Sequence, residues 1–193
     1  MNLLFDEALI AGLRYSEEII TAAEQHRLVE QLDALDLAPF RFHGWTGNRR
    51  TRSFGWRYDF EDASFSRTDG FPDCLVPLRE KAAAFAHLAP FDFVHALIAR
   101  YDPGAGIGWH RDRDVFEDVV GISLNTPATL RFRRRTQSGF ERVRLEMQPR
   151  SAYLLSGEVR HEWEHSISPG DALRFSITFR TLSAKGRRLA AEA

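Results

Sequence analysis

The amino-acid sequence predicts an α+β protein whose core is a β-sandwich or a jelly roll. Two observations lead to this class. Residues 1–40 and 72–88 carry apolar residues at helical spacing, whereas the chain from Phe93 onward alternates apolar and polar residues in about seven short segments rich in β-forming residues. Helices therefore come first and strands follow, which is typical of α+β folds and not of alternating α/β folds.

The helical part of the sequence has recognisable starts and faces. We expect the first 40 residues to be helical, with Ser16 as a helix N-cap followed by two glutamates in the first turn. One apolar face of this helix is formed by Leu28, Leu32 and Leu35. A second helix is expected over residues 72–88 and closed by Pro90, and its shared face consists of Leu75, Leu78, Ala82 and Phe85.

The expected strands are short and are separated by turn residues. They cover residues 94–98, 119–124, 129–133, 143–147, 152–155, 165–167 and 173–182. Residues 137–139 have the composition of a hairpin turn, so the third and fourth segments should pair with each other. Several short strands with regular turns are the pattern of a sandwich or jelly roll.

The composition indicates one cytoplasmic domain. The chain has 193 residues, 44% of them hydrophobic, which is enough for a core that needs no disulfide. Cys74 is the only cysteine, so no internal disulfide can form. The first residues lack the positive charge of a secretory signal, and no apolar run approaches the roughly 20 residues of a membrane span. We expect no membrane partner and a monomer, although the sequence leaves the oligomeric state open.

The net charge of −1 conceals two basic segments. Residues 40–57 contain five arginines and no acidic residue, and residues 131–150 contain seven arginines and two glutamates, so each segment has a charge of +5. The rest of the chain then carries −11. A charge near zero argues against a uniform nucleic-acid coat but permits a local basic surface. The alternative is that these segments are ordinary strand faces exposed to water.

The strongest local sign of chemistry is the sequence His110-Arg111-Asp112. On an extended chain two side chains at this spacing point to the same side, within reach of one cation. Two histidines and one carboxylate form the facial triad of Fe(II) oxygenases, which leaves open positions on the metal. A second histidine must come from elsewhere in the chain, and the downstream candidates are His161 and His165.

The same two histidines also suggest a rival. The segment from His161 to His165 matches H-E-x-x-H, the zinc-peptidase motif, which requires both histidines on one helix. Residues Ser168-Pro169-Gly170 break the chain directly afterwards, and the surrounding pattern indicates strands. In a strand, residues four apart lie roughly 13 Å from each other and cannot share a metal. The sequence therefore disfavours a zinc peptidase.

A third feature is the alternating segment 174–180. Its polar residues should face one side, and they are Arg174, Ser176, Thr178 and Arg180; three apolar residues between them should face the other. Two arginines on an inner face could hold a dicarboxylate by paired hydrogen bonds. The alternative is a solvated edge strand whose arginines extend into water.

Taken together and in this order, the motifs resemble the AlkB family of Fe(II)- and 2-oxoglutarate-dependent dioxygenases. The resemblance covers about residues 40–182 and rests on Arg100-Tyr101-Asp102-Pro103-Gly104, His110-x-Asp112, Ser123-Leu124, Ser156-Gly157-Glu158, Trp163-x-His165-x-Ile167 and Arg174–Arg180. It implies a double-stranded β-helix, or jelly-roll, core with N-terminal helices packed on it. It also implies one domain in which residues 1–92 hold helices and a nucleotide-recognition lid, 93–182 the dioxygenase core and 183–193 a tail.

The resemblance assigns roles to single residues. The iron ligands it implies are His110, Asp112 and His165. Arg174 and Tyr101 would bind the far carboxylate of 2-oxoglutarate, and Arg180 would lie near its other carboxylate. Two positions depart from the family pattern, because Ala99 and Ser176 stand where asparagine is usual. The loss at Ala99 removes one hydrogen bond to 2-oxoglutarate.

The resemblance also implies a substrate region. Substrate contacts are expected from Arg50, Phe54, Trp56, Tyr58, Asp114 and Arg142. The aromatic members of this set could stack a base, because a methylated base must be flipped out or already single-stranded to be reached. The implied reaction is oxidative demethylation of alkylated bases in DNA or RNA, with Fe(II), 2-oxoglutarate and O2 as cofactors and an alkylated single strand as partner. The alternatives are the same chemistry on a protein or small molecule, and a non-catalytic binding domain.

Overall fold

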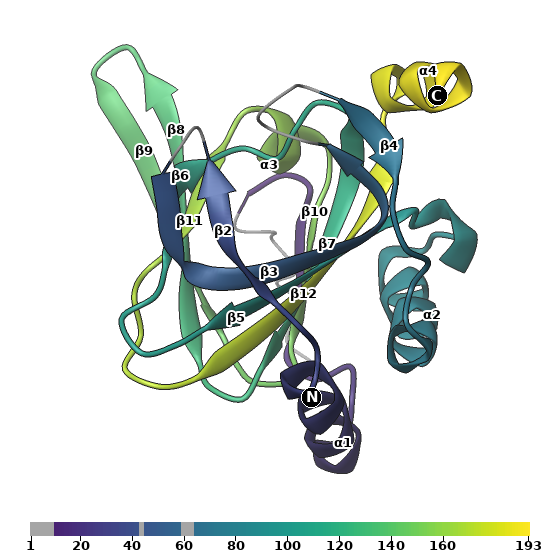
Figure 1. Cartoon of the computed structure of the whole chain (residues 1–193). Coiled ribbons are helices and arrows are strands. Elements are labelled where there is room, and N and C mark those ends of the chain that lie inside the picture. Colours follow the sequence, from purple (N-terminus) through teal and green to yellow (C-terminus); the bar gives the residue numbers. More distant parts are fainter. Residues whose placement is uncertain (1–9, 43–44, 59–63) are drawn as a thin grey trace, which may run out of the picture.

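The structure is a computed structural model, and it describes residues 10–42, 45–58 and 64–193 (Figure 1). The first half of the chain contains β1 (Leu13–Ser16), α1 (Ala22–Asp33), β2 (Ala38–Phe42), β3 (Trp45–Tyr58), β4 (Phe65–Arg67), the 3-10 turn η1 (Asp73–Leu75), α2 (Val76–Ala86) and η2 (Pro90–Asp92). The second half contains β5 (His95–Tyr101), β6 (Ile107–His110), β7 (Phe116–Leu124), β8 (Ala128–Thr136), β9 (Gly139–Met147), β10 (Ala152–Leu155), α3 (Gly157–His161), β11 (Glu164–Ile167), β12 (Arg174–Leu182) and α4 (Ala184–Glu192).

These strands form two antiparallel sheets. The major sheet has the order β1-β10-β7-β12-β5-β3-β2, with β4 paired to β3, and the minor sheet has the order β6-β11-β8-β9. From β5 to β12 the chain passes repeatedly from one sheet to the other, which is the winding of a jelly roll (Figure 1). The jelly-roll core predicted from the sequence is therefore confirmed.

The two faces of the major sheet are buried against different layers. Strand β12 shows the difference, because its alternate residues face opposite layers. Its apolar residues pack beneath α1 and α2, and they are Phe175, Ile177 and Phe179. The residues facing the minor sheet are polar and also buried, and they are Arg174, Ser176, Thr178 and Arg180. Since β12 lies between β7 and β5, the alternative of a solvated edge strand is wrong.

The expectation that the first 40 residues are helical is wrong in part for residues 10–40, and residues 1–9 lie outside the described ranges. Leu13–Ser16 forms β1, which pairs with β10 and so covers an edge of the major sheet. The helix starts only after Thr21, not after Ser16. Thr21 Oγ1 accepts a hydrogen bond from the Glu24 backbone, while the Glu24 carboxylate accepts one from Thr21 N at 2.7 Å. From there Leu28 and Leu32 are buried against the sheet as expected.

The second helix and the expected strands agree with the structure. η1 and α2 cover residues 73–86, and α2 ends where His87 adopts a left-handed conformation at φ 58°. Each expected strand has a counterpart in β5 or in β7–β12. The strands that the sequence did not predict are β1, β2, β3, β4 and β6.

The expected boundaries at residues 92 and 182 do not coincide with changes in the sheets. β1, β2 and β3 precede residue 92 but belong to the major sheet. Residues expected to be a tail form α4, which lies beside β4 (Figure 1). In the described part of the chain no helix is both long and apolar enough to cross a bilayer.

Candidate metal centre

His110, Asp112 and His165 meet at the junction of two minor-sheet strands. His110 ends β6, and Asp112 follows two residues later in the loop. β11 pairs with β6 so that His165 stands directly opposite His110, with 4.2 Å between the two ring centroids. Residues that face each other in an antiparallel pair point to the same side of the sheet. The strand pairing therefore brings together the three side chains that the sequence singled out.

The carboxylate of Asp112 has one occupied and one free oxygen. Oδ1 accepts hydrogen bonds from Arg180 Nη2 at 2.6 Å and Nε at 2.8 Å. Oδ2 is buried without any hydrogen-bond partner and lies 3.7 Å from Nε2 of His165. Only 6% of the Asp112 side chain and 10% of the His165 side chain are exposed. A buried carboxylate oxygen without a partner is costly, so this atom is suited to a cation.

The protonation states also favour a metal ion. Burial first, and then the neighbouring His110, lower the pKa of His165 to about 3, and burial lowers the pKa of His110. Burial by itself raises the pKa of Asp112, but Arg180 and the two histidines bring it far below its usual value. Neutral imidazoles and an ionised carboxylate are the forms that bind metals.

One hydrogen bond orients His110. Its Nδ1 lies 2.9 Å from the carbonyl oxygen of Gly108, so Nδ1–H donates and Nε2 keeps its lone pair. Among the described residues, no three His, Cys, Asp or Glu side chains already lie at the mutual distances of ligands around one metal ion. The 3.7 Å between Asp112 and His165 is slightly wide for two ligands of one ion. The free Oδ2 and the oriented imidazoles nevertheless fit a divalent cation with one carboxylate and two nitrogen ligands.

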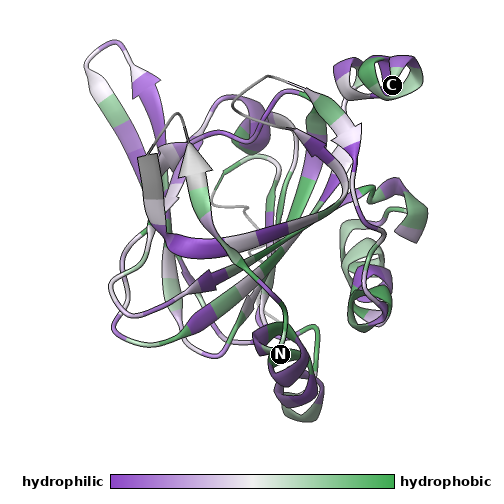
Figure 2. Cartoon of the chain, in the orientation of Figure 1, coloured by the Kyte–Doolittle hydropathy of each residue, from purple (hydrophilic) through white to green (hydrophobic). Residues whose placement is uncertain are grey.

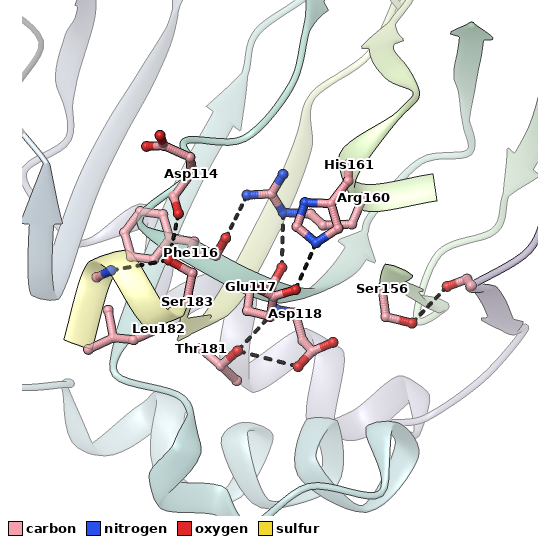
Figure 3. A network of polar contacts seen from close by, with 12 residues as sticks. Asp114, Phe116, Glu117, Asp118, Ser156, Arg160, His161, Thr181, Leu182 and Ser183 are labelled. Carbon is pink, nitrogen blue, oxygen red and sulfur yellow. Dashed lines mark hydrogen bonds and ion pairs between the residues drawn. The ribbon is translucent and has the colours of Figure 1, made fainter. Parts of the chain in front are cut away.

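The loop that carries Asp112 is fastened at several points (Figure 3). The buried Arg160 donates to the carbonyl oxygens of Arg113, Phe116 and Glu117 at 2.7 to 2.9 Å. Ser183 Oγ donates to the carbonyl oxygen of Asp114. Because the backbone on the C-terminal side of Asp112 is held in this way, the carboxylate is positioned before any ligand binds.

Arg174 is a second buried group with free hydrogen-bond donors. It is 4% exposed, and its Nε donates to Ser123 Oγ at 3.0 Å, while Nη1 and Nη2 have no partner. The guanidinium carbon lies 5.1 Å from the centre of the Tyr101 ring. A hollow of about 360 Å³ is bordered by both residues. Two free N–H groups in one plane match a carboxylate, which is the ligand expected here.

Arg180, which the resemblance places near the second carboxylate of 2-oxoglutarate, contacts Asp112 in this structure. Both of its contacts to Asp112 hold the metal-site carboxylate, and Nη1 lies 3.2 Å from Nδ1 of His95. Burial and the charge of Arg180 place the pKa of His95 well below its usual value, so His95 is a neutral acceptor. His95 was not predicted from the sequence, because it lies in the apolar segment 94–98 without any motif around it. It fixes Arg180, which in turn fixes Asp112.

The two departures from the family pattern lie side by side. Ser176 on β12 is the register partner of Ala99 on β5. This pair lies two residues along from the pair of Arg174 and Tyr101, on the same face of the sheet. Both short side chains therefore occupy neighbouring positions next to the residues expected to bind 2-oxoglutarate.

Two of the expected substrate residues point away from the site. Strand β3 pairs with β5 so that Arg49 shares the inner face with Thr51 and Ser53, whereas Arg50 faces outward and is exposed. Phe54 is 3% exposed and packs in the layer beneath the helices. The expectation that Phe54 could stack a base is wrong, because its ring is enclosed in the core.

Arg49 points into the site, whereas the sequence predicted its neighbour Arg50 as the substrate contact. It is 7% exposed, interacts with Tyr101 and has a buried Nε without a partner. Its guanidinium carbon lies 4.0 Å from the ring centre of Phe40. The alternation of β3 would have identified it, had that strand been predicted.

Trp56 and Tyr58 follow an irregular point in β3. Gly55 has φ 79°, which reverses the alternation, and both aromatics then join a small cluster around Phe65. Trp56 stacks on Phe65 at 5.0 Å, and Arg67 lies 5.3 Å from the Trp56 ring. Phe65 also contacts Phe116, and Phe116 contacts His95, so the cluster is linked to the residue that holds Arg180. The ring face that Trp56 turns to Phe65 is already covered.

Asp114 and Arg142 are both exposed. Asp114 pairs with Lys185 of α4 at 2.8 Å, and this contact lowers the pKa of Asp114. Arg142 is the register partner of Arg133 on the outer face of the minor sheet, opposite to the face that carries His165. The structure therefore keeps Arg142 away from the three gathered side chains.

The zinc-peptidase alternative does not fit this geometry. His161 ends the short helix α3 and contacts Glu117 at 2.7 Å, whereas His165 lies on β11. The two histidines are therefore on different elements. A jelly roll with two histidines and one aspartate gathered between its sheets has the fold and ligand set of non-haem Fe(II) oxygenases.

Comparison with known proteins agrees with this class. The family model of the 2OG-Fe(II) oxygenase superfamily matches residues 12–180. The chain belongs to this superfamily and, within it, to the AlkB family, which confirms the resemblance. The family implies Fe(II), 2-oxoglutarate and O2 as cofactors.

Several relatives show how far the similarity extends. The mouse tRNA (carboxymethyluridine(34)-5-O)-methyltransferase ALKBH8 is 28% identical over 94% of this chain and 30% of its own length. The Arabidopsis thaliana "Alkylated DNA repair protein ALKBH8 homolog" is 26% identical over 86% of this chain and 54% of its own. Escherichia coli AlkB is 28% identical over 74% and 68%. The chain thus spans about a third to a half of these ALKBH8 relatives. The structure of OsALKBH1 superimposes with a TM-score of 0.67 at 14% identity, covering 90% of this chain and 98% of that one.

Proposed function

We propose that this chain is an Fe(II)- and 2-oxoglutarate-dependent dioxygenase that oxidatively demethylates alkylated bases in DNA or RNA. The observation that carries the proposal is the pair of buried, unpartnered groups on the inner face of the jelly roll. Asp112 Oδ2 and both Arg174 Nη atoms are buried and form no hydrogen bond with the protein. The carboxylate oxygen suits a metal cation, and the guanidinium suits a carboxylate of 2-oxoglutarate.

The residues would divide the work as follows. Fe(II) would be held by His110, Asp112 and His165, and when bound with 2-oxoglutarate it supplies the oxidation of a C–H bond by O2. Arg174 and Tyr101 would bind the far carboxylate, and the buried strands around them exclude water. Arg180 keeps Asp112 ionised and turned so that Oδ2 faces the metal. On an N-methyl group the added hydroxyl leads to release of formaldehyde and the unmodified base.

Nucleic acid is the favoured substrate class for two reasons. The names of two relatives refer to alkylated DNA repair and to tRNA, and the chain carries two basic segments. We further propose a single-stranded substrate and helices α1 and α2 as a support for the site strands. The cytoplasmic location, the monomeric state and the single-domain division belong to the same proposal and rest on the sequence.

A formaldehyde-release assay tests this function. Protein loaded anaerobically with Fe(II) is mixed with 2-oxoglutarate and air-saturated buffer, together with N-methylated single-stranded DNA, RNA or lysine-methylated peptide. We expect formaldehyde and succinate in equal amounts from a nucleic acid and none from the peptide, and no turnover by Asp112→Asn. Turnover on peptides alone would instead support the protein-substrate alternative.

A further inference from the structure

The outer face of the minor sheet carries a concentration of arginines that the catalytic site does not use. Register pairs Arg131 with Arg144, Arg133 with Arg142 and Arg135 with Phe140 across β8 and β9. We call this surface the arginine face, and it consists of Trp109, Arg131, Arg133, Arg135, Phe140, Arg142 and Arg144. The residues between them point inward, and Phe132 and Leu145 are buried there.

Guanidinium groups and aromatic rings alternate across this face. Trp109 lies next to the guanidinium carbons of Arg131 at 5.2 Å and Arg133 at 4.5 Å. Phe140 lies next to those of Arg133 at 4.7 Å and Arg142 at 5.5 Å. Planar cations held next to half-buried rings are preordered, since the rings restrict their rotamers.

The positive charge of the face is only partly balanced. Two glutamates share the face with its five arginines: Glu164 pairs with Arg133 at 2.6 Å, whereas Glu146 accepts a hydrogen bond from Thr129. Arg135, Arg142 and Arg144 are exposed, and they form no ion pair with any other described residue. Like charges gathered without partners repel one another, which a polyanion would relieve.

The hairpin of β8 and β9 extends beyond the body of the fold, and hydrophilic residues cover much of it (Figures 1 and 2). At its base lies a hollow of about 530 Å³ bordered by Arg111, Arg133, Arg134, Arg135, Phe140, Glu162 and Glu164. Arg111 stands between the candidate ligands His110 and Asp112. The hollow therefore connects the arginine face to the segment of chain that carries two of the candidate ligands.

We infer that the arginine face binds the segment of single-stranded nucleic acid that flanks the reacting base. Exposed Arg135, Arg142 and Arg144 contact phosphates, and bases stack on the guanidinium and aromatic planes. An acidic protein surface would need the charges but not the interleaved rings, so the rings favour nucleic acid. The choice of partner rests on the proposed function, whereas the surface itself is observed independently of the catalytic site.

Oligonucleotide binding at several salt concentrations tests the inference. The full chain is titrated into a fluorescently labelled, unmethylated 12-nucleotide single strand, as RNA and as DNA, and anisotropy is recorded. Arg135→Ala combined with Arg144→Ala should weaken binding about tenfold at low salt. It should also reduce the slope of log K against log salt by about 1.4, since each phosphate contact on a single strand contributes about 0.7.

A matched pair of substitutions controls for net charge. Arg27→Ala with Arg188→Ala removes two exposed arginines from α1 and α4 and should leave the salt slope unchanged. Equal effects of both double variants would overturn the inference. Unfolding temperature and anaerobic 2-oxoglutarate binding, measured on each variant, should stay at the values of the unmodified chain.

Phe140→Leu separates nucleic acid from other polyanions. Loss of the ring should weaken oligonucleotide binding about fivefold or more and leave binding of a polyglutamate peptide unchanged. If the arginine variants lose both ligands equally and Phe140→Leu loses neither, the face is a general acidic-polymer surface and the inference is wrong. Failure of the proposed function gives a different result from failure of this inference. If only the proposed function is wrong, a methylated mononucleotide is not turned over, but salt-dependent oligonucleotide binding persists.

Discussion

Arg180 holds Asp112 by one oxygen and leaves the other free. Nη2 and Nε both donate to Oδ1, at 2.6 and 2.8 Å, while Oδ2 faces His165 without a hydrogen bond. If the guanidinium paired with both oxygens, neither carboxylate oxygen would be free to bind a metal ion. This one-sided pairing keeps the carboxylate ionised inside the protein and directs its remaining lone pairs to the site.

Asp112→Asn should abolish iron binding and turnover. The amide keeps the shape of the side chain but loses the charge that attracts the cation, so we expect Fe(II) affinity to fall by more than about 100-fold. Metal content after anaerobic reconstitution and dialysis measures this, with circular dichroism as the test of folding. Asp114→Asn, two residues further on and paired to Lys185, is the control. Normal iron content in Asp112→Asn would refute the ligand assignment.

Arg174→Gln should have opposite effects on binding and on stability. Loss of the charged donors should weaken 2-oxoglutarate binding roughly 10- to 100-fold. The ligand-free protein should be as stable as before or more so, because the substitution removes two buried N–H groups that have no partner. Calorimetric titration and urea unfolding measure the two quantities. Unchanged 2-oxoglutarate affinity would contradict the assigned role.

Arg160→Lys should loosen the loop that carries Asp112. A lysine cannot reach all three carbonyl oxygens that Arg160 now satisfies, and the remaining buried acceptors would cost about 2 to 4 kcal/mol of unfolding free energy. Iron affinity should fall about tenfold, as for other residues that support a ligand. His161→Ala next to it removes only an exposed contact to Glu117 and should change the unfolding free energy by less than about 1 kcal/mol. Equal urea midpoints for both variants would rule out a special role of Arg160.

Glu24 should contribute stability that depends on pH. The Lys81 ammonium, followed by the Thr21 backbone N–H, lowers the pKa of Glu24 from 4.5 to about 2. The contribution is therefore complete above pH 4.5 and disappears as the pH falls towards 2. Glu24→Gln should cost about 1 kcal/mol at pH 7, a modest value because the pair is partly exposed. Urea unfolding at pH 7 and pH 3 should show a smaller difference at pH 3, and the exposed Glu17→Gln should show none at either.

Gly55→Ala should destabilise the protein strongly. An added Cβ would lie 2.0 Å from the Val94 carbonyl oxygen, and the backbone has φ 79°. We expect a loss of more than about 2 kcal/mol in urea unfolding. Gly170→Ala, where a Cβ meets no atom within 4 Å, should be nearly neutral. A neutral Gly55→Ala would mean that β3 can reverse its alternation without this glycine.

Strand prediction succeeded where the chain alternates and failed where it does not. β7 to β12 carry regular apolar residues, whereas β3 combines six polar residues in succession, from Asn48 to Ser53, with the irregularity at Gly55. β1 is only four residues long and gains its stability from the β10 edge rather than from its own pattern. The choice between Arg49 and Arg50 depended on β3, and for that reason the outward residue was expected at the site.

The sequence by itself determined the pairing of His110 with Asp112 and the alternation of β12, because these depend on spacing along one strand or loop, and the family resemblance added His165. Tertiary structure decided what long-range pairing controls. It placed His165 opposite His110, joined Arg180 to Asp112 and enclosed Phe54 beneath the helices. It also put Arg142 on the outer face. The physical reason is that side-chain direction repeats locally every two residues, whereas the partner of a strand is chosen by the packing of the whole sheet.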